Sequence, residues 1–483
     1  MAKESKTSIE RERLEQRRWD ALRRTQHSAL RDFSLMLENE FLAPEELAAQ
    51  QSRLLSSLMT FAAERVPYYR ELLRGLGLST KRDWQTADLL HIPTLHKDTL
   101  RRRTADFRAE AFPVEELDGS IRSSGTTGQP VEVAQTRRSR HTLMLLLQRA
   151  QRWSRLNPLG SYAAIRIGKC FPDSDGSPLP RGVTARAEAW PLVGSYFKTG
   201  AYYGFCRANP LEHQIEWLRA VAPAYLCMDA PHLEHLALAM QESGRLESLR
   251  AVQSVCLPLT AGMRRRIVRV LGVPIHENYG LNELGIVASR CTHGRYHVHP
   301  EHCIVEVVGE DERPCAPGES GRAVVTCLTN FGMPLIRYET DDLVRVDDPC
   351  GCGLSLPTFG EVIGRYSAIK ALPRGTLDGV TAFRKVLEEL PAPFERLLRQ
   401  YQIHQTKNDG FELRLSLAEP CTPALSLLLQ REWSQTPHVG DLPLSIRLVD
   451  HIPNPFNTGD TGEPNGKFFH FTSDYCQGGP GGN

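Results

Sequence analysis

The stretch Ser123-Ser124-Gly125-Thr126-Thr127-Gly128-Gln129-Pro130 is rich in hydroxyl groups and glycines, and the alternating run Val131-Glu132-Val133 follows it. Glycine tolerates positive φ and has no Cβ, so such a loop can turn tightly and approach a ligand closely. Backbone N–H groups in a tight turn form an anion-binding concavity, and hydroxyl groups add donors to phosphate oxygens. The stretch therefore predicts a polyphosphate-binding loop, with a polar hairpin connection as the simpler alternative. It is not a Walker A loop, because no Gly-Lys-Ser/Thr sequence closes it.

Downstream of this loop, short apolar strands alternate with amphipathic helices. Strands are expected at about residues 162–168, 201–205, 225–228, 254–257 and 274–276, and helices at about 139–153, 212–220, 233–242 and 263–271. This alternation predicts a parallel sheet covered by helices. Ligands gather at the carboxyl ends of the strands in such sheets. The glycine-rich loop and the segment Asn278–Gly285 are therefore the candidate ligand-binding loops.

The composition is that of an ordinary globular protein. Of 483 residues, 41% are hydrophobic, and the net charge of +1 gives no general attraction to nucleic acid or membranes. The basic run Arg101–Arg103 lacks interleaved aromatic residues and is interpreted as surface charge. The longest apolar run, Leu143–Leu147, is too short to span a membrane, and the amino terminus lacks the apolar region of a secretory signal. We expect a cytoplasmic protein of two or three domains, whose cysteines are free thiols or metal ligands.

Further motifs follow the glycine-rich loop in a fixed order. They are Tyr279-Gly280-Leu281-Asn282-Glu283, Arg337-Tyr338-Glu339-Thr340-Asp341-Asp342-Leu343, Gly364-Arg365 and a late Gly466-Lys467. In this order the chain resembles the adenylate-forming enzymes, and most of all the phenylacetate–CoA ligase-like branch, which includes the coenzyme F390 synthetase relatives. Segments that look like this branch in particular are 64–70, 257–265 and 334–338. The resemblance extends from about residue 54 to about residue 470.

The resemblance implies a role for each motif. Glu283 resembles the glutamate that supports Mg²⁺, and Lys467 resembles the lysine that a mobile domain brings to the reacting carboxylate and α-phosphate. These two are the catalytic candidates. Asp342 matches the ribose-binding aspartate, and Tyr279 has the position that lies against adenine. The remaining expected ATP- or AMP-binding residues are Ser123, Ser124, Gly125, Thr126, Thr127, Gly128, Gly280, Asn282 and Arg365.

Four positions depart from the family pattern. Gln129 stands where many relatives have Lys, so the loop lacks one cation for the leaving phosphates. Asn282 replaces Thr or Ser, although its amide can still donate a hydrogen bond to phosphate. Asp341 replaces a Gly and places two carboxylates side by side, and Ser367 lies where a hinge Asp is usual. Nucleotide binding is expected to survive these changes, whereas full turnover with CoA is the step they are expected to affect.

A group of Cys and His residues suggests a metal site. Two thiolates from Cys350 and Cys352, together with Cys291 and His297, suit a tetrahedral structural zinc site. Many phenylacetate–CoA ligase-like proteins have a similar arrangement. His299 and His302 are competing ligands, and Cys303 is interpreted as a core residue. Buried free thiols are the alternative, because Cys-x-Cys is a loose signature.

The pattern changes to a small α+β unit after Tyr366. Its helices are expected at about 382–390 and 424–436, and its strands at about 399–404, 411–417 and 442–449. The predicted fold is α/β, with a large N-terminal adenylate-forming domain of helix-covered sheets and a small mobile α+β C-terminal domain. The predicted divisions are a helical extension at 1–53, an ATP- and acid-binding domain at 54–364, a C-terminal lid at 365–475 and a disordered tail at 476–483.

The predicted function is ATP-dependent activation of a small carboxylic acid, of aryl or arylacetic type, as an acyl-AMP, with transfer to CoA. Tyr202, Tyr203 and Phe205 could line an aryl pocket, and aromatic core is an equal alternative. A second hypothesis is an adenylating enzyme that passes the acyl group to an amine. A third is a nucleotide-binding protein without turnover. The expected cofactors are ATP, Mg²⁺, CoA as co-substrate and a structural Zn²⁺, and a homodimer is left open.

Overall fold

We describe the protein from a computed structural model. The structure describes residues 27–122, 131–166, 179–241, 244–257, 259–365, 376–391, 394, 397–407, 410–450, 452 and 471–474. The side chain of Arg365 is not included. The predicted phosphate loop Ser123–Gly128, Gln129, Ser367, Lys467 and the tail 476–483 lie outside the described residues. Among the residues that are described, no helix combines the length and the apolar character that crossing a membrane requires.

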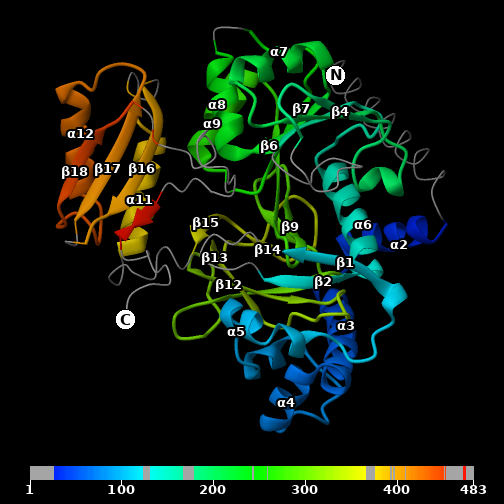
Figure 1. Cartoon of the computed structure of the whole chain (residues 1–483). Coiled ribbons are helices and arrows are strands. Elements are labelled where there is room, and N and C mark those ends of the chain that lie inside the picture. Colours follow the sequence, from blue (N-terminus) through cyan, green and yellow to red (C-terminus); the bar gives the residue numbers. More distant parts are fainter. Residues whose placement is uncertain are drawn as a thin grey trace.

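A nine-stranded sheet forms the centre of the large domain (Figure 1), in the order β14-β10-β9-β8-β7-β6-β3-β5-β4. The parallel strands are β3 (Tyr162–Arg166), β5 (Tyr202–Cys206), β6 (Tyr225–Asp229), β7 (Ala251–Val255) and the first part of β8 (Ile275–Leu281). The antiparallel strands are β4 (Thr184–Ala187), β9 (Gly285–Arg290), β10 (Tyr296–Val298) and β14 (Thr358–Phe359). The predicted parallel sheet is therefore present, with antiparallel strands at both edges.

Helices cover this sheet on both faces. On one face lie α7 (Leu211–Val221), α8 (Ala230–Ala239) and α9 (Ala261–Leu271), and their apolar residues form a core with alternate residues of the strands. Helix α9 begins where the Thr260 hydroxyl accepts a hydrogen bond from the amide of Met263, and it ends at Gly272, whose φ is +71°. On the other face, α6 (Arg137–Trp153) packs against α2 (His27–Glu38).

A second, four-stranded sheet has the order β11-β12-β13-β15. Its antiparallel strands are β11 (Cys303–Val308), β12 (Ser320–Cys327), β13 (Tyr338–Arg345) and β15 (Val362–Arg365). Its core is shared with α3 (Pro44–Arg65), α4 (Pro67–Gly75), α5 (Lys97–Arg102) and the hairpin of β1 (Leu117–Arg122) and β2 (Glu132–Thr136). Short 3₁₀ helices lie at Asn39–Phe41, Thr86–His91, Thr104–Phe107, Val114–Glu116 and Val193–Ser195.

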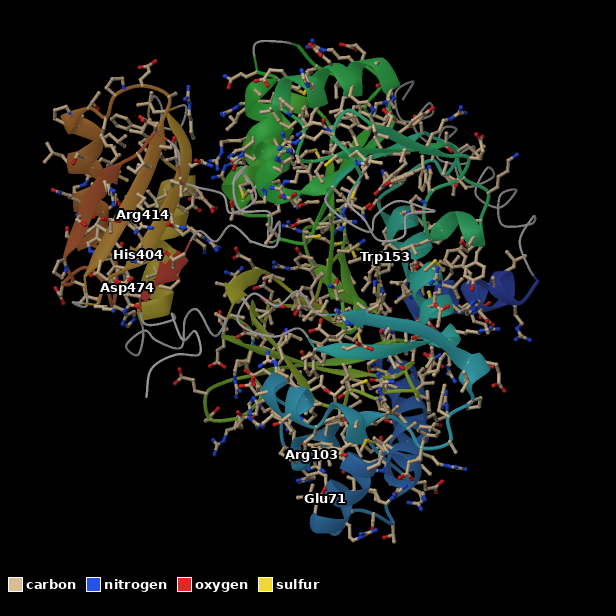
Figure 2. All side chains as sticks on the ribbon, in the orientation of Figure 1. Glu71, Arg103, Trp153, His404, Arg414 and Asp474 are labelled. Atoms are coloured by element: carbon tan, nitrogen blue, oxygen red, sulfur yellow. The ribbon has the colours of Figure 1, made fainter. Side chains whose placement is uncertain are left out.

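In its described residues, the small domain has a four-stranded sheet and two helices. The sheet order is β18-β17-β16-β19, with β16 (Leu398–Gln405), β17 (Phe411–Leu417), β18 (Leu444–Leu448) and β19 (Phe471–Ser473), and its helices are α11 (Thr376–Glu388) and α12 (Pro423–Ser434). The last strand, β19, pairs parallel to β16, and His404 Nε2 lies 3.2 Å from Asp474 Oδ1 (Figure 2). In Figure 1 this domain lies beside α8 and α9.

The structure differs from the sequence predictions in two places. Asn278–Gly285 is not a simple loop, because β8 continues to Leu281 and forms a hairpin with β9. The expected division after residue 53 falls within α3, whose apolar face packs continuously against the second sheet.

Candidate functional site

Tyr279 and Asp342 meet although 63 positions separate them in the sequence. Tyr279 is near the end of β8, and its hydroxyl donates to Asp342 Oδ2 over 2.9 Å and lies 3.2 Å from Thr340 Oγ1. The rings of Tyr279 and Phe359 pack edge-to-face, with their centroids 5.6 Å apart. Each of these two site residues keeps about 8% of its surface exposed, so the pair is held firmly and still reaches the surface.

The backbone of β13 is distorted at the predicted ribose-binding turn. The register of β13 against β12 shifts between the pairs Arg322↔Leu343 and Val324↔Glu339, which indicates a bulge around Asp341. Asp341 has φ of +63°, in the left-handed region that favours glycine. Substitution of the family's Gly by Asp therefore keeps the turn at some cost in backbone strain. The bulge directs Asp342 toward Tyr279, and Asp342 is also the strand partner of Arg365 in β15.

Glu283 lies in the connection between β8 and β9 and is largely buried. Its Oε1 accepts a hydrogen bond from the Tyr338 hydroxyl over 3.2 Å and lies 3.4 Å from the ammonium of Lys97. Lys97 comes from the first turn of α5, and its side chain is 29% exposed. A carboxylate held by one hydroxyl and one partly exposed cation has the chemistry to hold Mg²⁺ between itself and phosphate oxygens. Neither Lys97 nor the Tyr338 hydroxyl was predicted from the sequence to belong to the site.

The glycine-rich loop begins beside this segment. The Asn282 side-chain amide donates to the carbonyl of Arg122, the last described residue before the loop, over 3.0 Å. The β8–β9 hairpin needs Gly280, because a Cβ there would lie 2.2 Å from the carbonyl oxygen of Gly285. Arg122, Asn282 and Glu283 are therefore neighbours, and the loop that follows Arg122 lies outside the described residues.

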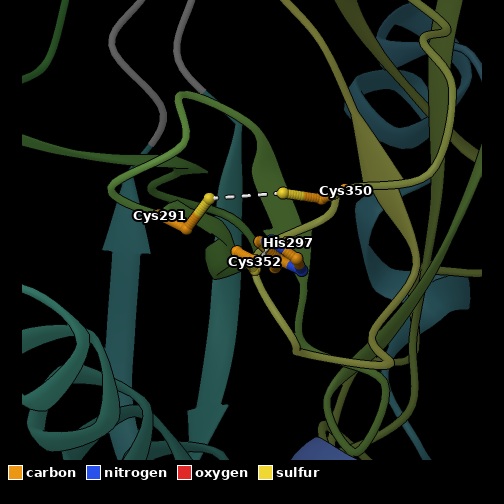
Figure 3. A group of neighbouring side chains, drawn as sticks. All are labelled: Cys291, His297, Cys350 and Cys352. Atoms are coloured by element: carbon orange, nitrogen blue, oxygen red, sulfur yellow. Dashed lines mark hydrogen bonds between the residues drawn. The ribbon is translucent and has the colours of Figure 1, made fainter.

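Four predicted metal ligands come together where β9 ends, beside β10 and the loop before β14 (Figure 3). Their donor atoms, on Cys291, His297, Cys350 and Cys352, all lie within 4.8 Å of one another. The Sγ atoms of Cys291 and Cys350 are 3.6 Å apart, and Cys352 Sγ is 3.3 Å from His297 Nε2. In tetrahedral zinc sites with Zn–S bonds of about 2.3 Å, sulfur atoms lie about 3.8 Å apart. The donor set and its spacing therefore fit a structural zinc ion.

The acidity of one of the thiols also suits a metal ligand, whereas burial raises the pKa of its neighbour Cys350 to about 12. Burial by itself raises the pKa of Cys291, but hydrogen bonds from His297 and from backbone amides outweigh it and lower the pKa to about 6. A thiolate is the form in which cysteine binds metal.

The two competing histidines are held elsewhere. His299 Nδ1 is 2.6 Å from Arg149 Nη2, and its Nε2 is 3.0 Å from Ser289 Oγ. The ring of His299 is also stacked against Trp153, which is labelled in Figure 2. His302 is 2.6 Å from the carbonyl of Leu284 and 2.9 Å from Thr329 Oγ1. Both rings thus have partners at both nitrogens, and Cys303 is a buried core thiol as predicted.

The three predicted pocket residues lie on two faces of β5. Phe205 stacks on Trp217 with ring centroids 4.7 Å apart, in the core beneath α7 and α8, and Tyr203 packs against the same core. Tyr202 faces the opposite side of the sheet, where it packs with Ala164 and Cys227. Tyr202 and Phe205 are 1% and 5% exposed, as residues of an aromatic core would be, and of the three Tyr202 lies on the face of the sheet away from α7 and α8.

The fold is that of the adenylate-forming CoA ligases. A solved structure of 2-hydroxyisobutyryl-CoA ligase, in the postadenylation state in complex with R3-HIB-AMP, superposes with a TM-score of 0.67 at 17% identity, covering 90% of this chain and 91% of that one. The chain is also 27% identical over 395 residues to a phenylacetate-coenzyme A ligase of Thermus thermophilus, and 28% identical over 403 residues to one of Escherichia coli. Each alignment covers 79% of this chain and 84% of the relative. No family model matches the chain.

These comparisons confirm the resemblance and the predicted fold class, and they confirm an adenylate-forming ligase as the class of enzyme. They give no support to an amine acceptor or to a homodimer. The individual roles of the site residues, the domain divisions and the metal site stay predictions.

Proposed function

We propose that this protein activates a carboxylic acid with ATP and passes the acyl group to CoA. The observation that most supports this is the approach of three sequence-distant motifs to one another. Tyr279 contacts Asp342 at 2.9 Å, Glu283 follows in the same hairpin, and Asn282 holds the residue from which the glycine-rich loop begins. Ribose, metal and phosphate groups would be bound by these neighbouring segments.

In the first half-reaction an oxygen of the substrate carboxylate attacks the α-phosphorus of ATP, and the bond to the bridging oxygen breaks to release pyrophosphate. Asp342 would accept hydrogen bonds from the ribose hydroxyls, and the ring of Tyr279 would lie against adenine. Glu283 would hold Mg²⁺, which supplies positive charge to the phosphate oxygens. Lys97 would add a cation near the terminal phosphates, where Gln129 offers none. Lys467 would stabilise negative charge as it develops in the transition state.

In the second half-reaction the CoA thiolate attacks the acyl carbon, and the carbon–oxygen bond to AMP breaks. We propose an aryl or arylacetic acid, because the curated relatives are phenylacetate-coenzyme A ligases. The face of the sheet with Tyr202, Ala164 and Cys227 is the proposed wall of the acyl pocket. A structural Zn²⁺ held by Cys291, His297, Cys350 and Cys352 would tie the end of β9 and strand β10 to the loop before β14.

The decisive experiment measures pyrophosphate release with a panel of aryl and aliphatic acids, with and without CoA. Release that depends on one class of acid, and thioester formation only with CoA, is the expected result. Amide formation with an added amine in place of CoA would instead establish the second hypothesis. ATP binding without release for any acid would establish nucleotide binding without turnover.

The variant Lys467→Ala tests the assigned catalytic lysine. Formation of acyl-AMP should be lost while the Kd for ATP changes little, because the residue acts on the transition state. Full activity in this variant would contradict the role proposed for Lys467.

A further inference from the structure

The small domain is attached to the large domain through the carboxylate of Glu388. This residue ends α11 and is only 4% exposed. Its Oε2 accepts a hydrogen bond from the backbone amide of Gly262 over 3.2 Å. Gly262 is in the first turn of α9, where amides have no acceptor within the helix and the helix dipole favours a negative charge. A carboxylate from one domain thus completes the amino end of a helix in the other.

Three more polar contacts lie at or beside Glu388. The Tyr401 hydroxyl donates to Glu388 Oε1 over 2.7 Å, within the small domain. From the large domain, the guanidinium of Arg265 donates to the backbone carbonyl of Glu388. Beside them, Gln400 Nε2 lies 2.7 Å from His235 Nε2. The contact between the domains is therefore made by hydrogen bonds, which fix the orientation of one domain relative to the other.

The domains approach so closely here that only glycine fits at position 262. A Cβ on Gly262 would lie 2.8 Å from Cγ and 2.9 Å from Cβ of Glu388. Gly262 is the second residue of α9, and the close approach of Glu388 accounts for a residue without a Cβ at this position.

Arg384 connects this contact to the strand before the interdomain connection. It lies one turn before Glu388 in α11, with Nε 3.7 Å from Glu388 Oε1. Its Nη2 donates to Glu361 over 2.7 Å and its Nη1 to the carbonyl of Ile363 over 3.1 Å. Ile363 belongs to β15, which ends at Arg365. One arginine therefore binds both the docking carboxylate and the last strand of the large domain.

Burial of Glu388 alone would raise its pKa, but Arg384, Tyr401 and the donors of α9 together lower it below the ordinary value. The group is thus charged and depends on partners from both domains. If the small domain turned away, Glu388 would lose the Gly262 amide, and α9 would lose its carboxylate.

We propose that Glu388 and Gly262 form a latch that holds the small domain against the large domain, and that this latch opens between the two half-reactions. This inference rests on the proposed two-step function. The latch stabilises the arrangement seen here, and its release lets the small domain turn relative to α9. Glu388 is a positioning residue, because it contacts the other domain and no reacting atom.

Hydrogen exchange of the residue 262 amide in the full chain tests the latch directly, without substrates. Relative to its intrinsic rate, this amide should exchange at least fivefold faster in Glu388→Ala and in Gly262→Ala. Glu389→Ala is the matched control, because the ion pair that Glu389 makes with Arg265 at 3.8 Å is exposed and such pairs contribute little, so this variant should behave as the unmodified chain. Gly262→Ala leaves the Tyr401 contact in place, so it remains informative if Glu388→Ala fails to fold. Unchanged exchange in both latch variants would overturn the proposal.

The two half-reactions provide the functional readout. The rate of pyrophosphate release in a single turnover without CoA is compared with the rate of thioester formation from preformed acyl-AMP. The ratio of these rates should change at least fivefold in both latch variants and stay constant in Glu389→Ala. Faster exchange with an unchanged ratio would reduce the contact to a structural one and overturn the latch. If the unmodified chain showed no turnover at all, the proposed function would fail, while the exchange experiment would still decide whether the contact forms.

Discussion

Removal of one zinc ligand should destabilise the large domain by an amount that can be derived from the structure. In Cys352→Ser the donor set Cys291, His297, Cys350 and Cys352 loses one thiolate, and the protein should lose its metal. The intact site joins Cys291 to Cys350 across 59 positions. A cross-link over a loop of about 60 residues removes about 4 kcal/mol of chain entropy from the unfolded state. This figure is an upper value, because an unfolded chain also binds some metal.

The expected change in Tm follows from the size of the domain. With an unfolding entropy of about 2 cal/mol/K per residue, a domain of about 340 residues converts about 4 kcal/mol into about 6 °C. The assay combines zinc quantification by mass spectrometry with calorimetry, before and after treatment with a chelator. The unmodified chain should contain about one zinc per molecule and lose about 6 °C on chelation, whereas Cys352→Ser should start at the lower Tm and not respond.

Cys421→Ser is the control for this experiment, because Cys421 lies in the small domain and outside the ligand group. It should keep the zinc and should leave the Tm of the large domain unchanged. A zinc content near zero in the unmodified protein, or a Tm that chelation does not change, would refute the assignment of these four residues as metal ligands.

Three further predictions concern the nucleotide site. Tyr279→Phe keeps the ring but removes a 2.9 Å hydrogen bond to Asp342, so the Kd for ATP, measured by calorimetry, should rise about tenfold; an unchanged Kd would separate the hydroxyl from ribose binding. Lys97→Met removes the cation 3.4 Å from Glu283 and should raise the KM for ATP about tenfold with little change in Tm; a large fall in Tm with no change in KM would make Lys97 structural. Asp341→Gly relieves a φ of +63° but also increases the entropy of the unfolded chain, so the free energy of unfolding should change by less than about 1 kcal/mol in either direction. A loss of more than about 2 kcal/mol in denaturant titration would show that the Asp341 side chain stabilises the turn.

The central strands and the main helices could be predicted because each has a local cause. Apolar runs bounded by polar residues gave the central strands, and β17 was predicted at the bounds that the structure shows. The β8–β9 hairpin could not be predicted in the same way. Asn278–Gly285 contains the Gly and Asn residues of a loop, but its conformation is set by antiparallel pairing with Ser289 and Ala288 and by close approach at Gly280.

The local sequence also does not decide which of three neighbouring histidines is the metal ligand. His297, His299 and His302 are all nearly fully buried, so burial does not distinguish a metal ligand from a core residue. Arg149 of α6 and Thr329, both distant in sequence, contact the rings of His299 and His302. His297 Nε2 instead lies beside Cys352. Lys97 and Glu388 were not given a role for the same reason, because each acquires its partner only through tertiary contacts.

The nucleotide site and the small domain are joined through one strand pairing. Asp342 of β13 is the strand partner of Arg365, the last residue of β15, so the proposed ribose ligand and the start of the interdomain connection belong to the same antiparallel pair. Arg384 of the small domain binds Glu361 and Ile363 at the other end of β15 and lies one turn from Glu388. A shift of Asp342 on binding ribose would therefore move the strand that α11 holds. This pairing gives a physical route by which occupancy of the nucleotide site can alter the docking of the small domain, through the backbone pairing of β13 with β15 and then through the Arg384 side chain.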